Sequence, residues 1–364
     1  MATSRRDVLR AVGAGAVGLG FAASAFSATT QRADGAKSGS RKMVIRADDI
    51  GQSKVCNIGT FEAIEGGIIT AADVMLDSPG TEDALERLRA YPWISIGWHM
   101  HMWGAPTLDP KRVPSLVEKD GQFAGRFRLD LAQQGDVVFE EALMELRAQL
   151  NKCLRILGKV PDTTGNGYPA TPWGRAVNQV LDEFGIAYGF SGGQPTPAYF
   201  QKTINDAQKA GEEWAKYWPA KASPGTNPDP KWASRKITSA GLSAFNNLLT
   251  DSISNVEKNY DPVLFYTEDR SGILKQPADV ISWQAWHPGY VDYYVYRLGE
   301  RVNRARAQQF VVGRTQDVSA MRDPRLRNWI RANRIELINF RDALYGTRDF
   351  QNHLESIGSD LAIV

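Results

Sequence analysis

The pattern of apolar and polar positions along the chain predicts strands that alternate with helices. Residues 43–47 form a short apolar run of the kind expected for a buried parallel strand, and two acidic residues follow it directly. Residues 137–157 carry apolar side chains at helical spacing as far as Gly158, so this segment is the clearest helix. Further strands are predicted at 68–76, 93–101, 186–190, 263–267, 280–286 and 335–340, and further helices at 57–65, at 82–91 with Thr81 as N-cap, and at 173–184.

This alternation indicates an α/β fold with a mostly parallel sheet. About seven such units favour a (β/α) barrel, whether regular or irregular and incomplete, over an open sheet, and reactive side chains are then expected at the carboxyl ends of the strands. We predict a single barrel domain over residues 41–345 and a C-terminal tail over 346–364. Residues 192–238 interrupt the pattern with Pro, Lys, Gly and Trp, so we predict an insertion there. Its aromatic side chains either stack on sugar rings over the active site or pack on the barrel.

The first residues have the features of an export signal rather than of a folded domain. Arg5 and Arg6 precede a Gly- and Ala-rich apolar run of about 16 residues, shorter than the ~20 that span a bilayer. We therefore predict a twin-arginine signal peptide and linker over residues 1–40, and a periplasmic or secreted protein. The alternative is a frayed helix or an uncleaved anchor. After export, Cys56 and Cys153 can form a disulfide or remain two separate buried thiols.

The charge balance excludes two classes of partner. The chain has 43 basic and 41 acidic residues, and removal of residues 1–28 leaves 40 of each. A protein that grips nucleic acid or an anionic membrane surface shows a basic patch or stripe, which this balance does not suggest. We expect a neutral or weakly charged substrate, no nucleic acid, and no membrane contact once the signal is removed. The sequence leaves a homodimer open.

Acidic residues and histidines follow three of the predicted strands. Asp48 and Asp49 are adjacent on an extended segment, so their side chains should point to opposite sides, one to bind a metal and one to accept a proton from water. Alone, the pair also suits helix capping with a salt bridge. His99 and His101 lie at i and i+2 of a strand and can share one metal ion, whereas a single histidine there would more often be a core residue. His287 precedes Pro-Gly and is either a general acid or a turn cap.

Five short motifs follow one another along the chain: residues 47–51 (Ala-Asp-Asp-Ile-Gly), 97–99 (Gly-Trp-His), 114–117 with 120–123, 287–290 (His-Pro-Gly-Tyr), and 323–326 with 335–342. In this order they resemble the motifs of the YdjC (ChbG/HpnK) carbohydrate deacetylases. The resemblance implies a barrel-like, polysaccharide-deacetylase-like fold and hydrolysis of acetyl groups from amino-sugar oligomers with a divalent metal, zinc or magnesium. Carried over position by position, Asp48 would be the general base, Asp49 and His99 metal ligands, and His287 a catalytic residue near the leaving group.

The sequence departs from the family pattern after the long helix, where the family supplies a second metal-binding histidine. Residues 161–168 contain no histidine. We therefore expect His101 to complete the metal site, with Asp162 or Asn166 as further oxygen donors. The alternative is a catalytically silent carbohydrate-binding protein on the same scaffold. The aromatic residues expected to contact the carbohydrate are Trp98, Trp103, Tyr168, Trp286 and Tyr290.

A third interpretation is a different hydrolase, such as a glycosidase that uses Glu268 and Asp269 at the end of a predicted strand. A loop salt bridge between this pair and Arg270 is the simpler reading.

Overall fold

A computed structural model describes most of the chain from residue 40 onward. Of the signal and linker predicted at 1–40 it describes residue 40 alone, and of the insertion predicted at 192–238 it describes residues 209, 237 and 238, so both stay predictions. The described residues are 40–100, 102–129, 131, 135–164, 171–188, 209, 237–239, 260–270, 272–303 and 307–363.

Six strands of the described part form one parallel sheet, in the order β3-β2-β1-β5-β4, with β6 paired to the start of β1. Parallel bridges from Gly97 to Thr163 and from Thr163 to Ala187 continue this order beyond β3. The α/β class and the parallel strands predicted from the sequence are confirmed. No pairing among the described residues closes the sheet into a barrel. The strands are β1 (Lys42–Ile50), β2 (Ala71–Val74), β3 (Ser95–Trp98), β4 (Ile237–Ser239), β5 (Ile281–Trp286) and β6 (Glu336–Leu337).

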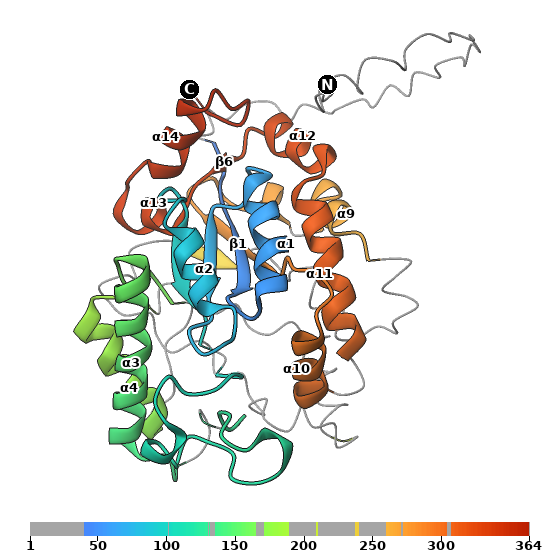
Figure 1. The fold of residues 1–364 in the computed structure, drawn as a ribbon. Coiled ribbons are helices and arrows are strands. Elements are labelled where there is room, and N and C mark those ends of the chain that lie inside the picture. Colours follow the sequence, from blue (N-terminus) through green and yellow to red (C-terminus); the bar gives the residue numbers. More distant parts are fainter. Residues whose placement is uncertain are drawn as a thin grey trace, which may run out of the picture. The chain divides into compact units, whose positions relative to one another are not determined.

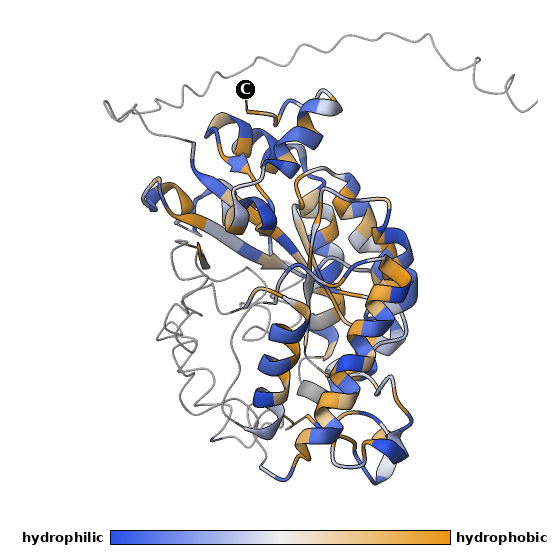
Figure 2. Cartoon of the chain, turned by 90° about the vertical axis from the view of Figure 1, so that its left-hand side faces the viewer, coloured by the Kyte–Doolittle hydropathy of each residue, from blue (hydrophilic) through white to orange (hydrophobic). Residues whose placement is uncertain are grey.

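Helices lie beside the sheet: α1 contacts β1, α2 contacts β2, and α11 packs on α1 (Figure 1). Figure 2 shows both hydrophilic and hydrophobic residues on the helices, as expected for helices that bury one face and expose another. In the part of the chain that the structure describes, no helix is long and apolar enough to cross a membrane. The helices are α1 (Lys54–Glu65), α2 (Thr81–Leu88), α3 (Phe139–Leu157), α4 (Pro172–Phe184), α9 (Pro262–Thr267), α10 (Tyr293–Asn303), α11 (Ala307–Met321), α12 (Pro324–Ala332), α13 (Phe340–Tyr345) and α14 (Asp349–Ser356).

The two faces of β1 pack into different apolar clusters. Met43 and Ile45 belong to the larger cluster, together with residues of the covering helices, whereas Val44 belongs to a smaller cluster with side chains of β2, β4 and β5. Successive residues of a strand point to opposite faces. Arg46 and Asp48 therefore follow Val44 onto the face of the smaller cluster.

Residues 263–267, predicted as a strand, lie in helix α9. The Asp261 carboxylate accepts hydrogen bonds from the amides of Val263 and Leu264, and Pro262 occupies the first turn. A short apolar run has no periodicity that separates strand from helix, so the capping residue and the proline decide. Thr81 is likewise not an N-cap, because Gly80 takes that position.

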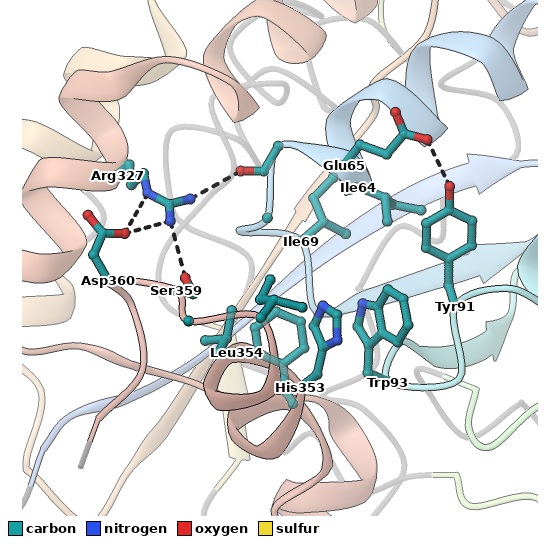
Figure 3. A pocket seen from close by; sticks show the side chains of 15 residues that line it. Ile64, Glu65, Ile69, Tyr91, Trp93, Arg327, His353, Leu354, Ser359 and Asp360 are labelled. Atoms are coloured by element: carbon teal, nitrogen blue, oxygen red, sulfur yellow. Dashed lines mark hydrogen bonds and ion pairs between the residues drawn. The ribbon is translucent and has the colours of Figure 1, made fainter.

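The tail predicted at 346–364 is packed against the domain. Helix α14 buries Phe350 and Leu354, which are each 1% exposed. His353 of this helix stacks on the Trp93 ring with 3.6 Å between ring centroids (Figure 3). A cavity of about 510 Å³ lies beside this contact, lined also by residues that precede β2 and β3. It therefore lies at the amino ends of the strands, away from the predicted site.

Candidate active site

The carboxyl ends of β1, β3 and β5 bring Asp48, Asp49, His99 and His287 together. Asp49 Oδ1 lies 2.9 Å from His99 Nε2, and Asp48 Oδ2 lies 3.9 Å from the same nitrogen. Asp48 Oδ2 also lies 4.0 Å from His287 Nε2. Strand β1 pairs with β5 directly and with β3 through β2, so residues distant in sequence end at one edge of the sheet.

Both carboxylates of the Asp pair point into this cluster, whereas the sequence predicted that they would face opposite sides. Asp49 adopts a left-handed backbone conformation with φ of 63°, and the pairing of β1 with β2 shifts register between Ala47 and Ile50. The irregularity breaks the two-residue alternation of the strand. A non-glycine residue at positive φ costs energy and persists where the surroundings hold it, which occurs often at functional sites.

Arg46 connects Asp48 to a third acid, Asp73 on β2. Its Nε and Nη2 lie 2.5 and 2.7 Å from the two Asp48 oxygens, and its Nη1 lies 3.0 Å from Asp73 Oδ2. All three side chains are less than 10% exposed. Burial raises the pKa of Asp48, but Arg46 and His99 outweigh it, so the net pKa is lowered. Burial and the charge of Asp48 raise the pKa of Asp73 to about 6, although Arg46 opposes them.

The pKa values of Asp49, His99 and His287 are shifted in different directions. Burial would raise the pKa of Asp49, but Arg314, whose Nη2 lies 2.5 Å from Asp49 Oδ2, and His99 outweigh this effect. The pKa of Asp49 is therefore well below its usual range. Burial would lower the pKa of His99, but the carboxylates of Asp48 and Asp49 raise it. Burial lowers the pKa of His287 to about 4, and the acids compensate only in part. At neutral pH the His287 imidazole is therefore uncharged.

Two atoms of the cluster suit a divalent cation. A carboxylate oxygen and an imidazole nitrogen are ligands for zinc and for several other divalent ions. Two ligands on one ion with bonds of about 2.1 Å lie roughly 3.0 Å apart in octahedral and roughly 3.4 Å apart in tetrahedral geometry, and Asp49 Oδ1 and His99 Nε2 lie 2.9 Å apart. The donor pair therefore fits a shared ion.

A third ligand does not come from the residues described. Within that part of the chain, no three or more His, Cys, Asp or Glu side chains are grouped so as to hold a metal. His101 and Asn166 lie outside the described residues and stay predictions. Asp162 is not at the site, because its carboxylate binds Lys159, Arg341 and the Ile96 amide at distances of 2.8–2.9 Å.

The predicted carbohydrate-binding aromatics are mostly not exposed. Trp98 is 1% exposed and Trp286 is fully buried, with its Nε1 donating to Tyr266 Oη. Neither ring offers a face to a substrate, because both fill the core beneath the site. Trp103 and Tyr290 are half-buried, and the Tyr290 hydroxyl donates to Glu62 at 2.6 Å. Tyr168 lies outside the described residues.

The glycosidase interpretation would require Glu268 at the active site, but this residue lies apart from it. It pairs with Arg270 at 2.5 Å, and both side chains are at least half exposed.

Several site residues were not predicted from the sequence: Arg46, Asp73, Arg314 and Asp317. Arg46 and Asp73 did leave a signal, since each is a charged residue inside an apolar strand. Arg314 and Asp317 lie on α11 with no comparable signal.

Gly97 on β3 provides the space that Asp73 occupies, and we expect Gly97→Ala to disturb the site. A Cβ at residue 97 would lie 1.9 Å from Asp73 Oδ1. The carboxylate would have to leave Arg46, so we expect a loss of about 1–3 kcal/mol of folding free energy, measured by urea denaturation. Gly135→Ala is the control, because a Cβ there would meet nothing within 4 Å and the backbone is not left-handed. A loss no greater than in this control would contradict the packing described.

Fold and site together define an α/β protein with a carboxylate–imidazole cluster at the carboxyl ends of parallel strands. The chain belongs to the family of YdjC-like proteins, whose family profile matches residues 42–332. The resemblance noted from the five motifs is thereby confirmed.

Named relatives match shorter parts of the chain. A carbohydrate deacetylase of Brevibacillus brevis is 38% identical over 112 residues, which are 30% of this chain and 43% of that protein. A chitooligosaccharide deacetylase of Serratia marcescens is 29% identical over 119 residues, 33% of this chain and 46% of that protein. The chain thus spans less than half the length of these relatives. A solved structure from Enterococcus faecalis, described as a candidate cellobiose-phosphate cleavage protein, shares the fold, with a TM-score of 0.55, 17% identity, and coverage of 84% of this chain and 99% of that one.

Proposed function

We propose that the protein is a metal-dependent hydrolase that removes acetyl groups from an N-acetylated or O-acetylated oligo- or polysaccharide. The observation that carries the proposal is the 2.9 Å separation of Asp49 Oδ1 and His99 Nε2, with Asp48 within 4 Å of both histidines. The names of the relatives in Brevibacillus brevis and Serratia marcescens support the choice of an acetylated carbohydrate.

Each residue has a role that its environment favours. Asp49 and His99 would hold a divalent ion, zinc or magnesium, which when bound polarises the acetyl carbonyl and lowers the pKa of water. Asp48 is ionised at neutral pH and accepts a proton from the attacking water. His287 is uncharged and lies 4.0 Å from Asp48, so it can take up this proton and deliver it to the departing nitrogen or oxygen. Arg46 holds the Asp48 carboxylate in place.

A cleft near the carboxyl end of β5, where the active-site cluster also lies, offers a surface for a carbohydrate chain. It has a volume of about 300 Å³, and its lining includes Phe123, Arg126, Tyr293, Tyr294 and Arg297. Helix α10, which contributes three of these residues, begins six residues after His287. Tyr293 is 76% exposed. Aromatic rings pack on the apolar faces of sugars, and guanidinium groups donate hydrogen bonds to their hydroxyl groups.

Acetate release tests the proposal. The purified full chain, loaded with zinc or magnesium, is expected to release acetate from N-acetylated chitooligosaccharides or from an O-acetylated polysaccharide. Removal of the metal with a chelator should lower the rate at least ~10²-fold, because the stabilisation of the developing oxyanion is lost, and added metal should restore it. Metal content is measured on the same samples.

Four variants separate the outcomes. Asp49→Asn and His99→Gln should reduce the bound metal, whereas Asp162→Asn, outside the cluster, should not. An unchanged metal content in His101→Ala would eliminate His101 as the third ligand. A protein that binds these glycans yet releases no acetate from any of them would favour the carbohydrate-binding alternative.

A further inference from the structure

Helix α11 carries two buried charged residues that face the active site. Arg314 is 1% exposed and Asp317 is fully buried. They are three residues apart, so they lie on the same face of the helix, one turn from each other. Buried charges are costly unless they are paired, and both of these residues are paired with parts of the active-site cluster.

Arg314 contacts both halves of the site. Its Nη2 lies 2.5 Å from Asp49 Oδ2 at the end of β1. Its backbone carbonyl accepts a hydrogen bond of 3.3 Å from the amide of Gly289, two residues after His287. A Cβ on Gly289 would lie 3.0 Å from Cys56 Sγ and 3.5 Å from Arg314 Cδ, so the turn is packed closely against α1 and α11.

Asp317 holds the backbone of His287. Its Oδ2 accepts a hydrogen bond of 2.9 Å from the His287 amide, and its Oδ1 accepts one of 2.6 Å from the Tyr260 hydroxyl. The Thr60 hydroxyl donates to the Pro288 carbonyl at 2.7 Å. Three successive residues of the His-Pro-Gly turn are therefore each held by a hydrogen bond from α1 or α11. These bonds fix the backbone position from which the His287 imidazole extends.

We propose that Arg314 and Asp317 are positioning residues that set the spacing between the Asp49 carboxylate and the His287 imidazole. The proposal rests on the function proposed above, for which these two groups must act on one bond. Neither positioning residue needs to touch the substrate. A buried ion pair stabilises a fold little compared with apolar residues of the same volume, so stability alone does not account for this arrangement. Misplacement of reacting groups by about 1 Å can lower a rate roughly 10²-fold.

The test compares disruptive variants with conservative ones on the same helix. Asp317→Leu removes both acceptor oxygens, whereas Asp317→Asn keeps one for the His287 amide. Arg314→Met removes the charge at Asp49, whereas Arg314→Lys keeps it. Val318→Ala is the control, because Val318 is 2% exposed on α11 and its truncation opens a cavity that loosens the fold. We measure kcat and KM for acetate release, the melting temperature, and ¹H–¹⁵N spectra of labelled histidine rings, of which the chain has four.

We expect Asp317→Leu and Arg314→Met to lower kcat about 10²-fold with KM within a few-fold of the wild type. Asp317→Leu should also shift the ring signals of His287. Asp317→Asn and Arg314→Lys should recover most of kcat. Val318→Ala should lower the melting temperature and leave kcat and the His287 signals unchanged.

Unchanged kcat and His287 signals in Asp317→Leu would overturn the proposal, as would an equal loss of kcat in Val318→Ala. If the wild type releases no acetate, the proposed function fails, and the His287 signals alone decide the positioning role: shifted signals support it and unchanged signals overturn it. If Asp317→Leu does not fold, Tyr260→Phe removes only the second hydrogen bond of Asp317. Shifted His287 signals are then expected, and unchanged signals overturn the proposal.

Discussion

Replacement of Arg46 by Met is expected to lower the free energy of unfolding by about 3–5 kcal/mol, because it leaves two buried carboxylates without their partner. Arg46 lies between Asp48 and Asp73, and these acids are 4% and 2% exposed. Methionine has a similar length and packs against Trp283, over which the guanidinium lies at 4.5 Å from the ring centroid. The loss therefore comes mainly from the charge. Urea denaturation at neutral pH measures it.

A second substitution and a surface control sharpen this result. Asp73→Asn in the Arg46→Met background should recover part of the loss, because one of the two uncompensated charges is removed. Arg322→Met removes an ion pair with Glu62 in which the arginine side chain is 53% exposed, and should cost no more than about 1 kcal/mol. An Arg46→Met protein as stable as Arg322→Met would show that the buried pairing does not hold the site together.

Asp48→Asn is expected to lower kcat for acetate release by about 10²–10⁴-fold, with KM little changed, because the amide cannot accept the proton of the attacking water. The lowered pKa of Asp48 keeps it ionised over the whole neutral range, so the wild-type rate should not fall through protonation of this residue between pH 6 and pH 8. Steady-state rates on a chitooligosaccharide, with metal content checked on the same samples, measure the effect.

The matched control is Asp162→Asn, which removes a carboxylate of similar contacts outside the site. Asp162 pairs with Lys159 and Arg341, so its loss should lower stability and leave kcat within a few-fold of the wild type. If Asp48→Asn retained more than about a tenth of wild-type kcat, another group would have to be the base.

The sequence was sufficient to predict which strand ends carry the reactive residues. Apolar runs followed by Asp48 and by His287 show where parallel strands stop, and in a parallel α/β sheet those ends share one edge. This rule predicted that Asp49 and His99 lie close together, and Asp49 Oδ1 lies 2.9 Å from His99 Nε2. Their role as ligands of one ion stays a prediction. The rule needs only the order of strands and helices, which hydrophobic patterning provides.

The local pattern of apolar residues was not sufficient to predict structure where a strand and a helix share the same pattern. It was also not sufficient where the burial of a side chain depends on residues distant in sequence. The run at 263–267 suits a strand or a short helix, and Asp261 with Pro262 made it α9. The sequence predicted that Trp98 and Trp286 contact the carbohydrate, yet both side chains fill the core. Helix α14 is polar enough to resemble a tail, and only its contacts with β6 and Trp93 show that it is packed.

By itself, the sequence determined the α/β class and the position of Asp48, Asp49, His99 and His287 at the ends of parallel strands, because periodicity and chain order encode both. Only the tertiary structure decided that Arg46 joins Asp48 to Asp73, that the backbone of Asp49 turns its carboxylate into the same cluster, and that α11 contacts both sides of the site. The reason is physical: the pairing of buried charges depends on which elements become neighbours, and the sum of packing interactions over the whole domain sets those neighbours.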